Sequence, residues 1–200
     1  MSGVIPPELL AYLGPEVAAI VITAVSALLA YKGGKKKEAQ KHIVELENNI
    51  RSYLRDEGLF PSPETTQVEK QRVDEILKDK IEDYNGDAVP IRVILTDGKY
   101  YLPNNKSEMV DAKTFNVFEY LPYRPDRFDC ENFASAYKTF AAFLWGTNGV
   151  ATVIDWSGGH AYNIIVYETG EIEFYEPQEG EVIEIGQGEK YQMDNATILL

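Results

Sequence analysis

The chain is poor in cysteine, histidine and basic residues, and these shortages narrow its functions. It has one cysteine in 200 residues, so it cannot form an internal disulfide. The sequence therefore neither requires nor excludes a reducing compartment. Its 19 Lys and Arg residues are outnumbered by 32 acidic residues, which gives a net charge of −13. Nucleic-acid binding needs clustered Lys and Arg, and the chain has one such run, at residues 35–37. We therefore expect no nucleic-acid partner.

The longest run with little charge lies near the start of the sequence. Residues 9–31 contain one charged residue, Glu16, and about 20 apolar residues cross a bilayer as a helix. Lysines follow this run and no Lys or Arg precedes it, which disfavours a cleaved signal and places the C-terminal part in the cytoplasm. The sequence predicts a single-pass membrane protein. The alternative is a virion component whose apolar helix is buried in a larger protein assembly.

Three segments are predicted along the chain. Residues 1–34 form the apolar segment, and residues 35–86 form a helical hairpin with a proline turn between two amphipathic helices. Residues 87–200 form the compact domain, and the 44% apolar content of the chain is enough for its core. This domain opens with two β-like runs around Asp97-Gly98, which is a strong hairpin signal.

The single cysteine stands at the predicted start of a helix. Asp129 is a good N-cap, and apolar residues recur at helical spacing from Cys130 until Gly146. The free N–H groups and the dipole at a helix start lower a thiol pKa from its usual value of about 8.5. The same N–H groups can hold an oxyanion. We predict that Cys130 is a nucleophile, while a small buried hydrophobic residue is the alternative interpretation.

Four strands joined by glycine-containing turns follow the helix and predict an antiparallel meander. A three-residue turn that ends in glycine pairs Tyr167 with Glu171. In this register Glu173 and Tyr175 face outward, and the apolar residues of both strands face the core. The predicted strands are residues 150–155, 160–167, 171–175 and 181–185.

The same register makes His160 and Glu176 diagonal neighbours on the core-facing side. A carboxylate on that side needs a partner, because burial of an unpaired charge is costly. We predict that Glu176 orients His160, which takes the proton of Cys130. Gln178, directly opposite His160, is the competing orienter. A structural histidine and a solvated acidic residue are the alternative interpretations of the pair.

Three short blocks resemble a known family, the papain-like cysteine protease domain at the C-terminus of fungal agglutinins. They are Phe-Asp-Cys-Glu-Asn-Phe-Ala at 128–134, Gly-Gly-His-Ala-Tyr-Asn at 158–163 and Tyr-Glu-Pro-Gln at 175–178. The resemblance implies an α+β papain-like fold in which the helix with the cysteine packs on an antiparallel sheet. It also implies a cysteine peptidase with a Cys130, His160 and Glu176 triad, which acts on a peptide or protein substrate through a thioester.

The resemblance also concerns ligands and further site residues. The fungal enzyme is calcium-dependent, and Asp126, Asp129 and Glu131 are candidate calcium ligands near the thiol. The sequence itself requires no cofactor. Trp156 and Gln178 are candidates for the oxyanion hole or the cleft wall. The fungal lectin module has no counterpart in this chain, so sugar binding is not carried over.

Two questions about function stay open at this point. The acyl acceptor is not fixed, because a cell-wall endopeptidase and a transglutaminase-like acyl transferase use a similar helix start. A non-catalytic structural role, in which the chain retains a peptidase-like fold, is the alternative to catalysis.

Overall fold

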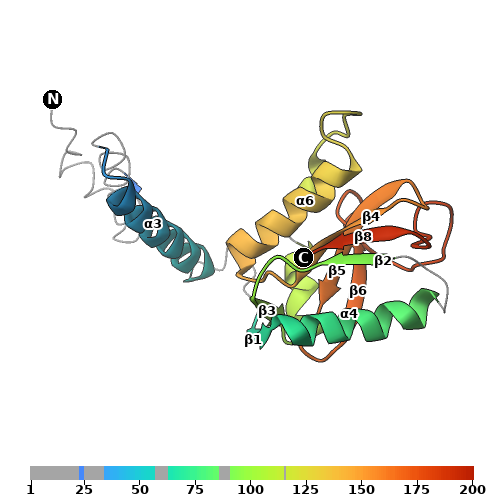
Figure 1. The fold of residues 1–200 in the computed structure, drawn as a ribbon. Helices are drawn as coiled ribbons and strands as arrows, with labels where there is room; N and C mark the ends of the chain where they lie inside the picture. The colour runs from blue at the N-terminus through green and yellow to red at the C-terminus, as the bar shows by residue number, and fades with distance from the viewer. Residues whose placement is uncertain (1–22, 25–33, 57–62, 86–90, 115) are drawn as a thin grey trace. The chain divides into compact units, whose positions relative to one another are not determined.

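The computed structural model describes residues 23–24, 34–56, 63–85, 91–114 and 116–200. The chain divides into two compact units, residues 1–60 and residues 61–200. The first unit contains helix α3 (Lys36–Asp56), an amphipathic helix at the predicted position. The second unit contains every described strand and all the predicted site residues (Figure 1).

A six-stranded mixed sheet forms the centre of the second unit, in the order β2-β8-β4-β5-β6-β7. The strands are β2 (Ile91–Ile94), β4 (Val150–Asp155), β5 (His160–Val166), β6 (Ile172–Glu176), β7 (Glu181–Ile183) and β8 (Ala196–Leu199). Strands β4 to β7 are the predicted antiparallel meander. The Tyr167 N–H donates to the Glu171 carbonyl at 3.0 Å, which confirms the predicted register of the β5–β6 hairpin.

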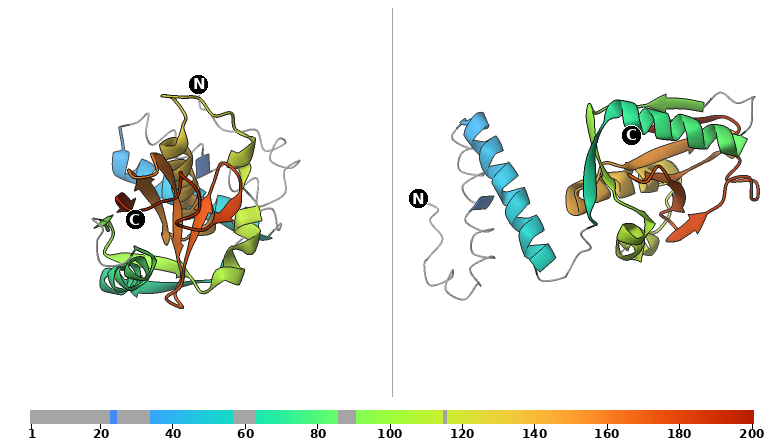
Figure 2. Two further views of the ribbon diagram at one scale, coloured as in Figure 1. Left: turned by 90° about the vertical axis from the view of Figure 1, so that its right-hand side faces the viewer. Right: turned by 90° about the horizontal axis from the view of Figure 1, so that it is seen from below.

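Helices cover both faces of this sheet. Helix α6 (Cys130–Phe140) packs on β4 and β5 from one side, and α4 (Lys70–Asn85) packs on the other side (Figures 1 and 2). One turn of π-helix, Ala141–Trp145, follows α6, and Gly146 ends it with a φ of 69°. The core under α4 contains Val73, Ile76, Leu77, Tyr162, Ile164 and Phe174, and the core under α6 contains Phe133, Tyr137, Ile165, Tyr167 and Tyr175.

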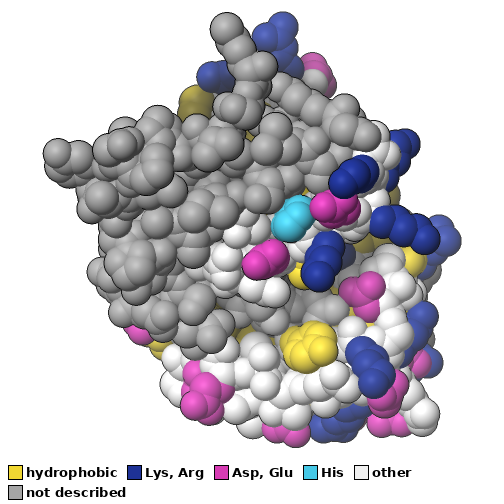
Figure 3. All heavy atoms as spheres, turned by 90° about the vertical axis from the view of Figure 1, so that its left-hand side faces the viewer, with side chains coloured by type: hydrophobic (Ala, Val, Ile, Leu, Met, Phe, Trp, Pro, Cys, Tyr) yellow, Lys and Arg dark blue, Asp and Glu magenta, His cyan; other side chains and the backbone are white. Residues whose placement is uncertain are grey.

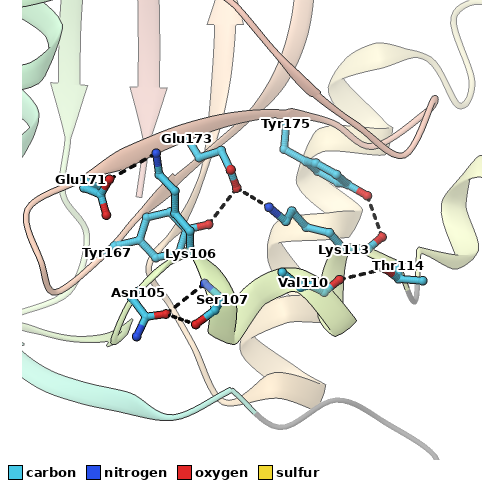
Figure 4. Close-up of polar contacts among 10 residues, drawn as sticks. All are labelled: Asn105, Lys106, Ser107, Val110, Lys113, Thr114, Tyr167, Glu171, Glu173 and Tyr175. Carbon is cyan, nitrogen blue, oxygen red and sulfur yellow. Dashed lines mark hydrogen bonds and ion pairs between the residues drawn. The ribbon is translucent and has the colours of Figure 1, made fainter.

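The prediction that Glu173 and Tyr175 face outward is wrong, because the second face of the sheet is also covered. Tyr175 is fully buried, and the Glu173 side chain is 12% exposed. The Glu173 carboxylate accepts from Lys113 Nζ at 2.6 Å and from the Tyr167 hydroxyl at 2.8 Å (Figure 4). Lys113 belongs to α5 (Val110–Thr114), which follows η2 (Lys106–Met109). This polar cluster holds the segment before Cys130 against the sheet.

The predicted hairpin around Asp97-Gly98 is also wrong. Strand β2 pairs in parallel with β8, and β3 (Lys99–Pro103) pairs with β1 (Thr65–Glu69) in a separate two-stranded sheet. Residues 65–69 lie within the segment predicted as a helical hairpin, but the β-branched Thr65, Thr66 and Val68 favour a strand. Helix α4 begins after them and packs on the main sheet. The observed division at residues 60 and 61 therefore differs from the predicted one near residue 87.

The prediction of a single-pass membrane protein with a cytoplasmic C-terminal domain requires correction. In the part of the chain that the structure describes, no helix has the length and apolar character needed to cross a membrane. The predicted span, residues 9–31, lies outside the described residues except for Thr23 and Ala24.

Candidate functional site

Cys130 is the first residue of α6, as the sequence predicts, and its sulfur lies against the start of β5. The Asp129 N–H donates to Asn132 Oδ1 at 3.2 Å, which is the reciprocal bond of a capping box. The thiol donates to Glu131 Oε2 at 3.3 Å, and the backbone N–H of Ala161 hydrogen-bonds the sulfur. The helix start is therefore preorganised around the thiol.

The pKa of the Cys130 thiol is raised, not lowered as predicted. Burial is the largest cause, and the hydrogen bond to the Glu131 carboxylate is the next. The N–H groups of Ala161 and Glu131 act in the opposite direction but do not outweigh these causes. The resting sulfur is therefore a protonated thiol, and its reaction needs a base.

The two acids beside the thiol influence one another. The hydrogen bond to Glu131 raises the pKa of Asp129. The pKa of Glu131 is lowered, first by its own backbone N–H and then by the Cys130 thiol. The charge of His160 is a further cause of this lowering, which places the imidazole in electrostatic reach of Glu131. Glu131 therefore contacts the thiol and interacts electrostatically with the imidazole.

His160 and Glu176 form the closest polar contact of the site. His160 Nε2 lies 2.6 Å from Glu176 Oε2, and the side chains are 10% and 2% exposed. This contact confirms the pairing predicted from the hairpin register. A carboxylate oxygen accepts hydrogen bonds, so this contact favours the tautomer with the hydrogen on Nε2 and leaves Nδ1 as the ring nitrogen for another partner. His160 directly precedes Ala161, whose backbone N–H hydrogen-bonds the Cys130 sulfur, so the start of β5 carries the imidazole and lies against the start of α6.

The Glu176 carboxylate is buried, and both of its oxygens have hydrogen-bond partners. Oε1 accepts from the Gln178 N–H at 3.0 Å and from Gln178 Nε2 at 3.3 Å. Oε2 accepts from His160 and from the Tyr191 hydroxyl, at 3.1 Å for the latter. Gln178 therefore supports the acid and does not replace it as the partner of His160.

The side-chain donors of Trp156 and Gln178, which were predicted for an oxyanion hole or a cleft wall, already have hydrogen-bond partners. The amide of Gln178 is occupied by Glu176, and the Trp156 Nε1–H donates to Thr197 Oγ1 at 3.1 Å. Trp156 is 60% exposed and caps the end of β8 rather than pointing a free donor at the thiol. Tyr191 carries no signal in the sequence that points to this site, because its contact with Glu176 depends on the path of a long connection.

A groove of about 370 Å³ adjoins the segment that leads to the cysteine. Its lining combines apolar side chains with two guanidinium groups, from Leu121, Pro122, Arg124, Arg127 and Phe128. Burial, followed by the charge of Cys130, raises the pKa of the neighbouring Tyr123, so this segment borders the thiol.

The candidate calcium ligands do not form a metal site within the described residues. Asp129 and Glu131 lie together, but no group of three or more His, Cys, Asp or Glu side chains there is arranged to hold a metal ion. Calcium dependence stays a prediction of the family resemblance. On the described part of the face in Figure 3, Lys and Arg side chains lie among Asp and Glu side chains.

Comparisons with known proteins give structural neighbours only. No protein-family model and no curated protein matches the chain. One similar solved structure is the PSL1a-E64 complex, with a TM-score of 0.46 and 20% identity over 67% of this chain and 51% of that chain. Another is Polyporus squamosus lectin bound to Neu5Aca2-6Galb1-4GlcNAc, with a TM-score of 0.45 and 20% identity over 67% and 49%. The chain spans about half the length of these neighbours.

These neighbours require a correction of the predicted activity. They are structures of a fungal lectin, and neither is described as a peptidase. The predictions of a cysteine peptidase, of a thiol protease and hydrolase class, and of a peptide or protein substrate are therefore not carried forward. The similarity to both structures is low, at 20% identity, and carries no activity or ligand over to this chain.

Proposed function

We propose that Cys130, His160 and Glu176 form a thiol site that takes up an acyl group as a thioester and passes it to an acceptor. The observation that supports this proposal most is the 2.6 Å contact between His160 Nε2 and the buried Glu176 carboxylate, next to the strand residue whose N–H bonds the sulfur. A buried His–carboxylate pair beside a thiol at a helix start is the arrangement that activates a nucleophile.

In the first half of the reaction, the thiol gives its proton to His160 Nδ1 and the sulfur attacks a carbonyl carbon. The carbon–sulfur bond forms, and the bond between that carbon and its leaving group breaks. The leaving group takes the proton from the imidazolium. Glu176 accepts from Nε2 throughout, which holds the tautomer and stabilises the positive charge on the ring. Free N–H groups at the start of α6 stabilise the negative carbonyl oxygen.

In the second half, an acceptor with an O–H or N–H bond attacks the carbonyl carbon of the thioester, so that a carbon–oxygen or carbon–nitrogen bond forms and the carbon–sulfur bond breaks. Its proton goes to His160 and then to the sulfur, and the thiol is restored. Because the resting thiol is bonded to Glu131, it must leave this carboxylate before it donates to His160. Glu131 therefore slows the first step of the reaction.

The test is uptake of an acetyl group from p-nitrophenyl acetate, followed by intact-mass measurement. The chain has one cysteine, so a thioester can form at no other residue. We expect one acetyl group that is lost on addition of glycinamide, with acetylglycinamide as the product. Cys130→Ala measures background acetylation of lysine and tyrosine.

Equal acetylation of the wild type and Cys130→Ala would contradict the proposal. It would favour the competing proposal, in which the domain has a structural role and no reactive thiol.

A further inference from the structure

Tyr191 contacts both members of the buried pair from a segment remote in sequence. Its hydroxyl donates to Glu176 Oε2 at 3.1 Å, the same oxygen that lies 2.6 Å from His160 Nε2. Its ring centroid lies 5.6 Å from the His160 ring in an edge-on arrangement, with an interplanar angle of 64°. It lies 5.4 Å from the Tyr162 ring at 79°. Tyr191 therefore bonds the acid and flanks the imidazole.

The segment that carries Tyr191, residues 186–195, is fixed to the turn between β4 and β5. The buried Asp155 accepts from the Met193 N–H at 2.8 Å and from the Gly158 N–H at 2.9 Å, which joins the segment to the turn. The Ser157 hydroxyl accepts from the Asp194 N–H at 2.9 Å. These bonds hold the segment beside the first residue of β5, which is His160.

The Glu176 carboxylate is held at both oxygens by donors from different parts of the fold. Gln178 holds Oε1, while His160 and Tyr191 share Oε2. Without the Tyr191 hydroxyl, Oε2 would keep only the imidazole as a partner, so nothing other than His160 itself would fix the position of this oxygen. The hydrogen bond between Glu176 Oε2 and His160 Nε2 would then be less well oriented.

Other charged groups surround this pair. Glu131, in the first turn of α6, interacts electrostatically with His160. Glu179 and Glu181, on the connection between β6 and β7 and at the start of β7, act on Tyr191, and Asp155 of β4 lies behind Tyr162. The Tyr191→Phe change leaves all of these groups in place.

We propose that Tyr191 is a positioning residue, which fixes the Glu176 carboxylate and, through it, the His160 imidazole for proton transfer with Cys130. The inference rests on the proposed thiol site. It adds a fourth residue to that site, one that touches neither the thiol nor the acyl group.

The test compares Tyr191→Phe with Tyr101→Phe, which removes an exposed hydroxyl that bonds Gln67 at 3.0 Å in the other sheet. We expect the maximal rate of acetyl uptake from p-nitrophenyl acetate to fall about fivefold in Tyr191→Phe, because one hydrogen bond is lost. The ester concentration at half-maximal rate should not change, since Tyr191 does not touch the ester. Tyr101→Phe should match the wild type. An unchanged maximal rate in Tyr191→Phe would overturn the inference.

A second measurement separates this inference from the proposed function. The His160 Nε2–H proton, bonded at 2.6 Å, should give a downfield NMR resonance that moves and broadens in Tyr191→Phe and not in Tyr101→Phe. An identical resonance in the wild type and Tyr191→Phe would overturn the positioning role. A moved resonance in a protein whose wild type takes up no acetyl group would contradict the thiol site and leave the positioning of His160 by Tyr191 supported.

Discussion

At the scale of single residues, the Cys130 thiol has two partners that act in opposite directions. The Glu131 carboxylate accepts its proton in a hydrogen bond and raises its pKa, after burial as the larger cause. In the proposed reaction, His160 instead accepts the proton itself and sets the thiolate free. The balance between these two partners sets the fraction of protein molecules whose Cys130 is reactive at neutral pH.

Glu131→Gln tests this balance. Removal of the negative charge takes away two of the causes that raise the Cys130 pKa, so the thiolate should form at lower pH. Since Glu131 is largely exposed, we expect an effect of about 0.5 kcal/mol, or roughly a twofold increase in thiolate at a given pH. Thiolate ultraviolet absorbance during a pH titration measures it.

Glu168→Gln, in the exposed turn between β5 and β6, is the matched control and should titrate like the wild type. A Cys130 titration in Glu131→Gln that moves to higher pH would refute the assigned role of Glu131.

The residue scale also shows where sequence reasoning succeeds and fails. The His160–Glu176 pair was predictable, because one short turn fixes the register of two adjacent strands. The direction of the Cys130 pKa shift was not predictable. The sequence shows that the thiol lies at a helix start, which lowers the pKa, but it does not show that β5 partly buries the sulfur, which raises the pKa. Tyr191 reaches the same carboxylate through a connection whose path no local pattern encodes.

At the scale of elements, the turn between β4 and β5 joins two distant parts of the chain. Gly158 lies so close to Lys190 that an added Cβ would be 2.2 Å from the Lys190 carbonyl oxygen. Asp155 completes the connection through its bonds to the Gly158 and Met193 N–H groups. The position of Tyr191 therefore depends on the absence of a side chain at residue 158.

Gly158→Ala should destabilise the fold and displace Tyr191, because the clash is with backbone atoms that cannot rotate away. We expect a loss of about 1–3 kcal/mol in the free energy of unfolding, measured by urea denaturation. Gly98→Ala is the matched control, since a Cβ there meets nothing within 4 Å. It should change the free energy by less than about 0.5 kcal/mol. Equal stabilities of the two variants would show that the close approach at residue 158 does not hold the segment.

Among the elements, those formed by neighbours in sequence were predictable and those formed by distant pairing were not. The β4 to β7 meander and α6 follow from periodicity and turn glycines. Strand β8 lies between β2 and β4 with partners more than 40 residues away, and β1 pairs with β3 across α4. Such pairings depend on the assembled core, which sequence periodicity does not report.

At the scale of the whole molecule, α4 belongs to the same core as the strands of the site. Its residues Val73, Ile76, Leu77 and Ile81 are buried against the main sheet. Each buried side chain of this kind stabilises by about 1.5–3 kcal/mol. Their sum is comparable to the whole stability of a domain, about 5–15 kcal/mol. The predicted domain start at residue 87 therefore leaves out part of the core.

Two fragments test this division. Residues 61–200 should unfold cooperatively in urea with a native circular dichroism spectrum, because they contain the sheet and both covering helices. Residues 87–200 should be unfolded or aggregate, because one face of the sheet would be exposed to water. Cooperative unfolding of the shorter fragment with the same midpoint would contradict the shared core.

The central claim is that His160 activates the Cys130 thiol, and the rate of acetyl uptake across pH in His160→Ala tests it most directly. The chain has two histidines, so His42→Ala is a matched control. At neutral pH we predict a rate about a hundredfold lower in His160→Ala than in the wild type, and no change in His42→Ala. The difference should shrink at high pH, where the raised pKa of Cys130 is passed and the thiolate forms without a base. Equal rates for His160→Ala and His42→Ala at neutral pH would contradict the account.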